Sequence, residues 1–463
     1  MIRAAVCVLG GGPAGSAIAL RLAQLGHAAV LVEKSPFPRP HIGESLAPDI
    51  LAILETLGIR GEVEARGFLR PDAAIVRWGG ESAIRPASGD RGFQVDRASF
   101  DLLLLRAVAA AGAIVQQPFA ARALERTSDG GWLVHGRNES IETHYLVDAT
   151  GRSGRLGGRK QRVAAPTLAL YAYWCETVLH GPETRVEAGE SEWYWGAPLP
   201  DGFFNATVFV DPARCARGHA DLYGRLLRRS ALLQGCLNGR RITEVKCCDA
   251  TSYCDEDPVA DNLVKAGEAS FSIDPLSSQG VRSAMGSALH GALVLNTMIR
   301  RPESAPAAAA FYTARQREAV SQHRQWAGRY YAEAAQRFDT PFWRSRAIVQ
   351  PSPEQMKTDA GSAETVGPDA QLRLSSEARI VEMPRVEGDF ILAGSAVEHP
   401  SLARPLAYLD GIDVPDLLAG FASSERACDV VARWRCKMPA AQAVRVLAEL
   451  FRLGVLVRDS HRG

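Results

Sequence analysis

The sequence lacks any long uncharged apolar run and any excess of one charge. None of its apolar runs reaches the roughly 18 residues that a membrane-spanning helix needs. Lys and Arg number 53 against 52 for Asp and Glu, so the net charge of +1 gives no reason to expect nucleic acid or an anionic membrane as a partner. The chain enters an apolar strand pattern at once, and Gly10 to Gly12 would interrupt a signal-peptide core. We therefore expect a cytoplasmic protein.

Paired cysteine motifs are also missing. The nine cysteines are scattered, no two form a C-x-x-C pair, and none has zinc-finger spacing to a histidine. We expect free thiols and no metal. The one local cluster is Cys247, Cys248 and Cys254, where a disulfide or a metal site is the alternative. No spaced Ser/His/Asp set is present either.

The first 34 residues have the pattern of a dinucleotide-binding unit. A short apolar run is followed by Gly10, Gly12 and Gly15, then by a helical pattern, and a second apolar run ends in Glu33. In such a unit the glycines permit a tight turn and the close approach of a pyrophosphate, and the helix N-terminus binds the phosphates. The acid accepts hydrogen bonds from a ribose. A glycine turn without a ligand is the alternative.

Three later turns are candidates for the same site. A proline-rich loop leads into residues 43–45, which we expect to open a helix, with Glu44 or Ser45 near a cofactor or acting only as a cap. An apolar strand ends in Asp-Ala-Thr-Gly at 148–151, where the carboxyl edge of a parallel sheet binds cofactors. Residues 272–281 form a Ser/Gly-rich turn before a helix of small residues.

Residues 165–255 are rich in aromatic side chains and alternate like strands. We interpret them as an antiparallel sheet that covers a substrate cavity, with the densest aromatic stretch at 192–200. Ordinary cross-strand core packing is the alternative for these rings.

The motifs occur in the order used by FAD-dependent monooxygenases of the para-hydroxybenzoate hydroxylase type. Three stretches are more similar to flavin-dependent halogenases: 40–46 resembles their loop, 193–198 their WxWxIP motif with Ala197 in place of isoleucine, and 274–281 their flavin-contacting turn. The resemblance covers about residues 1–350. It implies FAD as the cofactor.

The same resemblance contains one departure. Halogenases carry a lysine that relays hypohalous acid to the substrate, between a Gly-Phe pair and a Trp-Gly pair. In this chain Pro71 falls at that place, no lysine is nearby, and the neighbouring Arg70 stays protonated and cannot replace it. Glu268 also stands where an aspartate is usual. The missing lysine argues against halogenation and for oxygen or electron transfer from the flavin.

The resemblance implies the following residues at the site. FAD contacts are expected from Gly10, Gly12, Pro13, Ala14, Gly15, Glu33, Lys34, Ser45, Arg97, Thr150, Gly267, Glu268, Pro275, Gly280 and Val281. Substrate contacts are expected from Tyr173, Trp193, Trp195 and Phe204, and weak candidates for a catalytic base are Glu44 and Glu192.

The tail adds a second resemblance. Residues 397–418 are similar to the winged-helix peptide-recognition fold of peptide-maturation enzymes, with a small packing or oligomerisation domain as the alternative. Together the two likenesses resemble the flavoprotein monooxygenases of tryptophylquinone biogenesis. They imply hydroxylation of a tryptophan side chain in a precursor polypeptide through a flavin C4a-hydroperoxide.

That function implies O2 as co-substrate and an external reductant, because no second nucleotide fingerprint is present to hold NAD(P)H. Other maturation enzymes are possible partners. A halogenase of a tethered or small aromatic, and a non-catalytic flavin-bound maturation chaperone, are the alternatives.

The predicted fold class is α/β, with a Rossmann-like FAD-binding domain, an inserted antiparallel-sheet substrate domain, a helical region and a winged-helix-like C-terminal domain. The predicted segments are 1–160 and 256–300 for the FAD-binding domain, 161–255 for the substrate domain, 301–350 for the helical region, 351–385 for a linker and 386–463 for the C-terminal domain.

Overall fold

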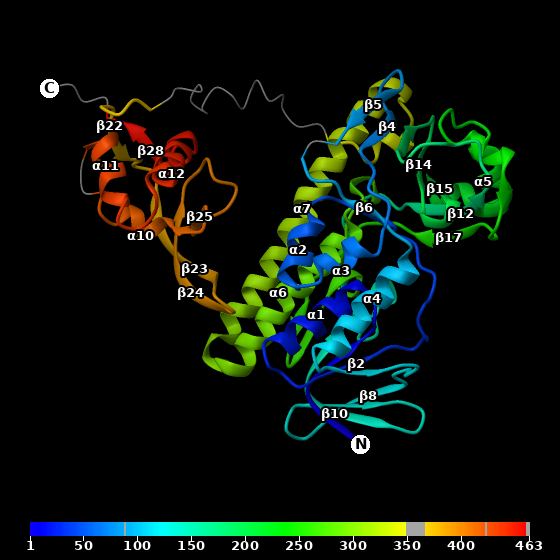
Figure 1. Cartoon of the computed structure of the whole chain (residues 1–463), viewed down its shortest axis with the longest axis horizontal. Coiled ribbons are helices and arrows are strands. Elements are labelled where there is room, and N and C mark those ends of the chain that lie inside the picture. Colours follow the sequence, from blue (N-terminus) through cyan, green and yellow to red (C-terminus); the bar gives the residue numbers. More distant parts are fainter. Residues whose placement is uncertain (88, 349–365, 422–423, 460–463) are drawn as a thin grey trace. The chain divides into compact units, whose positions relative to one another are not determined.

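The computed structural model describes residues 1–87, 89–348, 366–421 and 424–459. They form two compact units (Figure 1). The first holds residues 1–302 and 312–348, and the second holds the described residues of 303–311 and 366–459. Residues 349–365, which include the first part of the predicted linker, lie outside the described residues.

An eight-stranded sheet forms the centre of the first unit. Its path runs β19-β20-β10-β1-β2-β7, and β9 pairs with both β10 and β8. The strands are β1 (Ile2–Leu9), β2 (Ala29–Val32), β7 (Ile114–Gln116), β8 (Ala123–Arg126), β9 (Trp132–His135), β10 (Ser140–Asp148), β19 (Val259–Ala260) and β20 (Leu263–Lys265). β20, β10, β1, β2 and β7 pair in parallel. Every residue of β2 is buried, as expected for a parallel strand covered on both faces.

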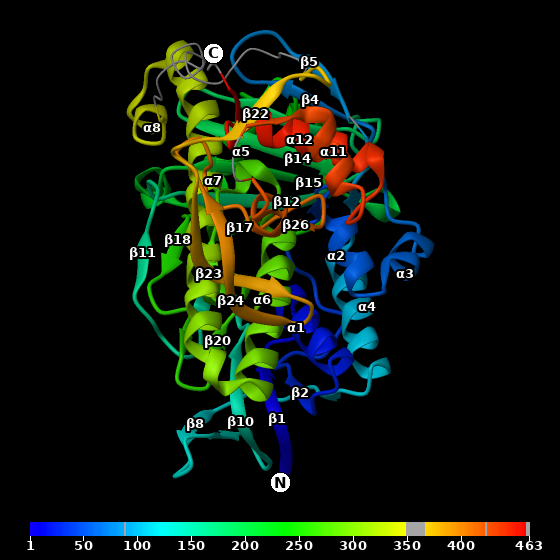
Figure 2. The ribbon, with the colours of Figure 1, turned by 90° about the vertical axis from the view of Figure 1, so that its left-hand side faces the viewer.

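Helices of the first unit pack on this sheet and on each other. They are α1 (Pro13–Gln24), α2 (Ile50–Thr56), α3 (Arg60–Ala65), α4 (Arg97–Ala110), α6 (Gly280–Arg300), α7 (Ala305–Phe338, here from residue 312) and α8 (Pro341–Arg344). Figure 2 shows α1 beside α6, next to β1. Ala14, Gly15 and Ser16 of α1 are small and buried. On α6, Gly291 lets the two helices approach closely, because a Cβ there would lie 3.0 Å from the side chain of Ile18 on α1. Pro13 lies in the first turn of α1. Backbone N–H groups there have no partner within the helix, so the missing N–H of proline costs no hydrogen bond.

A second eight-stranded sheet follows the order β16-β12-β15-β14-β13-β4-β5, with β17 beside β12. Its strands are β4 (Ala73–Arg77), β5 (Ala83–Pro86), β12 (Leu168–Cys175), β13 (Thr184–Ala188), β14 (Glu192–Pro198), β15 (Phe204–Val210), β16 (Arg240–Arg241) and β17 (Lys246–Asp249). One face packs on α5 (His219–Leu227), which lies beside β12 and β15 in Figure 1. The other face carries Trp193 and packs on Trp78, Tyr331 and Trp343.

Two short sheets complete the first unit: β11 (Lys160–Arg162), β18 (Tyr253–Asp255) and β21 (Phe271–Ser272), and the pair β3 (Ser45–Leu46) and β6 (Phe93–Gln94). The pairing of β3 corrects one expectation, because residues 43–45 do not open a helix. Ser45 pairs with Gln94, and the next helix starts at Ile50.

A second correction concerns the segments between 113 and 147. Strand patterns at 113–117, 121–126, 131–136 and 141–147 predict a small antiparallel insertion, but the insertion consists of β8 and β9, with β9 pairing antiparallel to β10. β7 is a parallel edge strand of the main sheet, and β10 is central to it. Both therefore belong to the dinucleotide-binding sheet itself.

The second unit is built around three helices, α10 (Val414–Leu418), α11 (Ala427–Trp434) and α12 (Ala440–Arg452), which share one apolar core. Its strands are β22 (Gln371–Leu374), β23 (Arg379–Glu387), β24 (Phe390–Glu398), β25 (Tyr408–Leu409), β26 (Ile412–Asp413), β27 (Glu425–Arg426) and β28 (Leu456–Arg458). β22 and most of β23 lie inside the predicted linker, so the secondary structure of the second unit begins before residue 386. Leu372 belongs to the core of this unit and is fully buried. A winged-helix assignment stays a prediction.

Candidate functional site

The first unit contains a cavity of about 730 Å³. Its wall is formed by the carboxyl ends of β1, β2 and β10, by the N-termini of α1 and α6, and by one face of the second sheet. The carboxyl ends of parallel strands meet at one edge, which is where ligands of such sheets bind. The cavity therefore lies at the place that the glycine motif predicts.

The glycine turn at this edge has no room for side chains at two positions. Gly10 has a φ of +102°, and a Cβ there would lie 2.5 Å from the carbonyl oxygen of Ala149. A Cβ on Gly15 would lie 1.8 Å from the carbonyl oxygen of Gly10, so α1 packs directly on the turn. At Gly12, which precedes α1 and lines the cavity, a Cβ would come no closer than 3.6 Å to Arg39. The space that a side chain at Gly12 would fill is therefore part of the cavity.

Glu33 lies at the end of β2, where the motif requires an acid. Its carboxylate is 5% exposed and accepts hydrogen bonds from the backbone N–H of Gly11 at 2.8 Å and of Ser35 at 2.9 Å. These bonds fix the carboxylate against the glycine turn, in the cavity wall.

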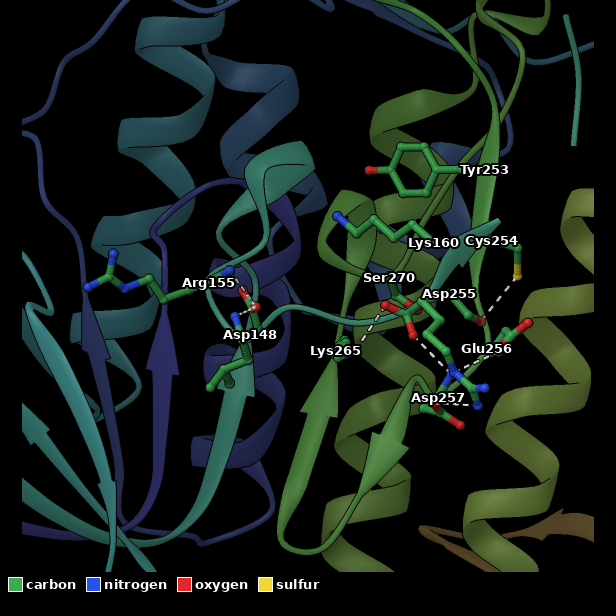
Figure 3. A network of polar contacts seen from close by, with 12 residues as sticks. Asp148, Arg155, Lys160, Tyr253, Cys254, Asp255, Glu256, Asp257, Lys265 and Ser270 are labelled. Atoms are coloured by element: carbon green, nitrogen blue, oxygen red, sulfur yellow. Dashed lines mark hydrogen bonds and ion pairs between the residues drawn. The ribbon is translucent and has the colours of Figure 1, made fainter. Parts of the chain in front are cut away.

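Asp148 organises the turn after β10 (Figure 3). Its side chain is fully buried and accepts bonds from the Thr150 hydroxyl and from the backbone N–H groups of Thr150, Arg155 and Leu156 at 2.6 to 3.0 Å. Four donors hold this carboxylate in one orientation. Its role is to hold the turn of which Thr150 lines the cavity.

A buried ion pair supports the neighbouring strands, also visible in Figure 3. Lys265 on β20 donates to Asp255 on β18 at 2.9 Å, and both side chains are almost fully buried. Lys160 nearby donates to the carbonyl oxygens of Arg152 and Glu268 and lies over the ring of Tyr253. Both lysines are therefore engaged by protein groups.

Arg97 lines the cavity, but most of its donors are used by the protein. It makes a two-bond pair with Asp101 at 2.8 and 3.0 Å and donates to the carbonyl oxygen of Ile42 at 2.8 Å. Its main visible role is to fix the loop before Glu44. Arg39 is the cation with looser pairing in this wall, with 4.0 Å to Glu33 and 3.9 Å to Asp101.

The second sheet presents a grid of side chains to the cavity. Its register aligns Tyr173 with Asn205, Tyr171 with Thr207, and Ala169 with Phe209. β14 adds Ala197, Trp195 and Trp193 to the same three rows. Ala169, Trp195, Thr207 and Phe209 line the cavity, and Trp193 stacks on Phe209 with ring centroids 3.7 Å apart. The wall is therefore polar at the Asn205 row and apolar at the Phe209 row.

Glu44 closes the polar end of this wall. It is 2% exposed and accepts bonds from the Tyr173 hydroxyl, from the Asn205 amide at 3.1 Å and from the backbone N–H of Gly43 at 2.9 Å. Burial raises the pKa of its carboxyl, although the three bonds oppose that shift.

The turn before α6 forms the opposite wall. Asp274 caps it by accepting from the backbone N–H of Leu276 at 3.0 Å, and it also accepts from the Tyr331 hydroxyl. Ser278 adopts a left-handed conformation, with φ of +52°, and the chain then enters α6 at Gly280. Free backbone N–H groups of a helix start thus face the cavity.

Two buried polar atoms of the wall have no hydrogen-bond partner within the described part of the chain. They are the indole N–H of Trp195 and the hydroxyl of Ser283. An unpaired buried donor costs about 1–3 kcal/mol, so a ligand that offers acceptors to them would bind favourably.

Most of the predicted cofactor residues meet at this cavity. Its wall contains Gly10, Gly12, Pro13, Ala14, Glu33, Lys34, Ser45, Arg97, Thr150, Gly267, Glu268, Pro275, Gly280 and Val281. Gly15 does not line the cavity, because it packs against the turn behind it.

The predicted substrate residues divide between the two faces of the sheet. Trp195 lines the cavity, while Trp193 and Tyr173 lie on the same face without reaching it. Phe204 was assigned to the wrong face: it packs with α5 in the core behind the sheet. Glu192 lies on that side too, where it accepts from Tyr194 at 2.9 Å and pairs with Arg214 at 2.6 Å. Glu192 is therefore a structural residue.

Several wall residues were missed by the sequence analysis. Arg39, Arg152, Thr207 and Cys248 all line the cavity. Arg39 lies in the proline-rich loop and could have been recognised by its charge. Nothing local distinguishes Thr207 or Cys248, because their position depends on the register of the second sheet.

Pro71 does not line the cavity, and among the described lining residues the one lysine is Lys34, which is exposed and follows Glu33. Arg70 donates to the carbonyl oxygen of Arg91 at 2.7 Å and lies over the ring of Phe93.

No group of three or more His, Cys, Asp or Glu side chains among the described residues could hold a metal ion. Over the same residues, no helix has the length and apolar character needed to cross a bilayer. All nine cysteines are unpaired.

Comparison with known proteins agrees with this geometry. The family model for tryptophan halogenase matches residues 5–85 and 86–371. A tryptophan 2-halogenase of Chondromyces crocatus is 31% identical over 374 residues, which are 74% of this chain and 70% of that protein. Among solved structures, the flavin-dependent halogenase CmlS superposes with a TM-score of 0.82 at 23% identity, over 99% of this chain and 96% of its own.

A second solved structure has a different activity. The peptidyl tryptophan dihydroxylase QhpG, essential for tryptophylquinone cofactor biogenesis, superposes with a TM-score of 0.75 at 24% identity, over 98% of this chain and 99% of its own. At these identities both structures show a shared fold, a mixed α/β flavoenzyme architecture. The family match and the 31% identical relative go further, and from them we conclude that the chain belongs to the tryptophan halogenase family.

Proposed function

We propose that this protein is an FAD-dependent monooxygenase that hydroxylates a tryptophan side chain of a precursor polypeptide, as a step in building a tryptophylquinone cofactor. The observation that carries the proposal is a flavin-type cavity whose one lysine among the described lining residues is Lys34, which is exposed and follows Glu33, while the strands of the aromatic wall contribute none to the lining. A halogenase needs a relay to move its oxidised halogen to the substrate, and Pro71 stands outside the cavity at the expected place.

The cavity fits FAD on three counts. The space left by Gly12 lies at the N-terminus of α1, which suits a pyrophosphate. Glu33 stands where a ribose would be held, and Arg39 adds a cation beside the turn. The unpaired Trp195 N–H and Ser283 hydroxyl would be satisfied by ring carbonyls or nitrogens. The proposed FAD contacts are the predicted cofactor residues that line the cavity, together with Arg39.

Bound FAD, once reduced by an external donor, supplies oxygen activation. The chain's own residues would bind and orient the aromatic ring and exclude water from it. Trp195 and Phe209 offer flat apolar surfaces for such a ring, and Glu44 offers an acceptor at the edge. NAD(P)H or a separate reductase is the proposed electron donor.

The second unit is proposed to hold the polypeptide. The likeness to the peptidyl tryptophan dihydroxylase extends over 98% of the chain and so includes this unit. Its three helices and terminal strand are compatible with a peptide-recognition module.

Membership of the tryptophan halogenase family favours a second candidate, halogenation of an aromatic substrate. The test is to incubate reduced holoenzyme with O2, chloride and a tryptophan-bearing precursor polypeptide and to weigh the product. Added oxygen supports the proposal, added chlorine identifies a halogenase, and an unmodified polypeptide that stays bound identifies a chaperone. Free tryptophan is the control for the substrate class. A purified protein that binds no FAD would refute all three.

A further inference from the structure

A buried carboxylate forms part of the cavity wall, and no ion pair to it is found within the described residues. Glu44 precedes β3 and lies against the polar row of the second sheet. Burial of an ionised carboxylate is costly unless donors compensate for the lost water. Tyr173, Asn205 and the backbone of Gly43 supply three such donors.

Three donors do not saturate this group. An ionised carboxylate has about four lone-pair positions, so one acceptor position remains beyond the three hydrogen bonds. Two of the three bonds go to Oε1 and one goes to Oε2, which leaves the spare capacity on Oε2. Because Glu44 lines the cavity, that capacity is available to a bound molecule.

The surroundings indicate what kind of molecule would use it. Asn205 is itself fixed, because its amide oxygen accepts from the Thr207 hydroxyl at 2.9 Å. Next along the wall come Thr207 and Trp195, and then the apolar surface of Ala169 and Phe209. A planar apolar ring with one hydrogen-bond donor on its edge matches this order of polar and apolar groups.

We propose that Glu44 is a specificity-determining residue, whose carboxylate accepts a hydrogen bond from the ring N–H of an indole held in the cavity. The inference rests on the proposed function for the identity of the ring. It concerns recognition alone, so it does not depend on whether oxygen or a halogen is added.

Other ionisable groups near Glu44 do not compete with it as acceptors of this hydrogen bond. Tyr173 and Tyr171 on β12 stay protonated, since burial raises the pKa of Tyr173 far above its usual range and that of Tyr171 to about 12. Arg97 on α4 keeps its charge and pairs with Asp101. His41 lies three residues before Glu44 and also lines the cavity, so it needs its own control.

The experiment measures binding of two probes to the FAD-loaded protein by calorimetry: 3-methylindole, and 1,3-dimethylindole, which lacks the N–H. A hydrogen bond to a charged acceptor predicts that the wild type prefers 3-methylindole by roughly 10-fold or more. Glu44→Gln keeps the side-chain shape and should lose most of that preference.

Glu192→Gln is the matched control, because it neutralises a buried carboxylate on the face of the second sheet that points away from the cavity. It should keep the wild-type preference. FAD content is measured for each variant. A Glu44→Gln protein that loses FAD but still discriminates between the probes would overturn the proposal, because Glu44 would then serve the cofactor.

The pH profile of the wild type tests the same point without a variant. Only the ionised carboxylate offers its full acceptor strength, so affinity for 3-methylindole should rise as the pH increases through the raised pKa of Glu44, and affinity for 1,3-dimethylindole should stay flat. His41→Gln should keep this profile. Equal binding of both probes by the wild type, a flat profile for both, or no binding of either would contradict the proposal. If the probes behave as expected and the product carries chlorine, the proposed reaction fails while Glu44 keeps this role.

Discussion

Glycines of the first turn have two distinct roles at the residue scale. Gly15 is required by packing, because a Cβ there would overlap the carbonyl oxygen of Gly10. Gly12 has ordinary φ of −72° and room for a Cβ, so the protein itself does not need a glycine there. The difference separates a structural role from a ligand role.

This contrast predicts opposite outcomes for two matched substitutions. Gly12→Ala should fold with nearly unchanged stability and lose FAD affinity at least about 10-fold, because the added methyl group intrudes where a pyrophosphate would lie. Gly15→Ala should lose about 1–3 kcal/mol of unfolding free energy with or without FAD. Urea unfolding and FAD titration measure the two effects. Unchanged FAD binding by Gly12→Ala would argue against a pyrophosphate at this turn.

The predicted substrate and catalytic residues of the second sheet differ in the face of the sheet on which their side chains lie. Trp195 and Phe209 share one face with Thr207, whereas Phe204 and Glu192 alternate to the other face. Alternation along one strand is visible in the sequence. Which face meets the cavity depends on α5 and on the register between strands far apart in the chain, and no local pattern reveals that.

At the scale of elements, α8 is held by one aromatic side chain. Trp343 is fully buried and donates its indole N–H to the carbonyl oxygens of Gly189 and Glu190, both at 3.1 Å. Its ring contacts Trp78 edge-on at 5.5 Å. Through these contacts α8 packs on the face of the second sheet that also forms the cavity wall, in one core cluster with Trp193.

Trp343→Ala should therefore lower the free energy of unfolding by about 3–5 kcal/mol, through the cavity and the lost bonds. Trp326 on α7 is 40% exposed and contacts mainly Tyr330, so Trp326→Ala should cost less than about 1 kcal/mol. Denaturant unfolding of both variants gives the comparison. Equal losses would mean that α8 is not anchored by this ring.

Elements formed by distant pairing were the ones that the sequence did not reveal. Ser45 and Leu46 form a strand because residues 93–94 pair with them, although the local motif resembles a helix cap. The glycine turn and the helices α1 and α6 follow from local sequence patterns, and the sequence predicts them. α4 also has a local start signal, because Asp96 caps it by accepting from two backbone N–H groups.

At the scale of the whole molecule, the sequence predicts a linker over 351–385, yet the described part of this range contains β22, which pairs with β28. Leu372 of β22 is fully buried in the core of the second unit. The polar composition around Leu372 does not reveal this pairing, because the partner strand is distant in the sequence.

The thiols permit a test on the whole chain. All nine cysteines are free, and Cys247 and Cys436 are the exposed ones. The thermal midpoint should not change when a reducing agent is added, and nine thiols per chain should titrate in denaturant without reductant. Fewer than nine would reveal a disulfide that the structure does not contain.

The central claim is oxygen transfer to a polypeptide tryptophan, and isotope labelling tests it most directly. Reduced holoenzyme is given ¹⁸O-labelled O2, chloride and a tryptophan-bearing precursor polypeptide, and the polypeptide is then analysed by tandem mass spectrometry. The account predicts labelled oxygen on the tryptophan side chain. Chlorine on that side chain, or oxygen without the label, would contradict it.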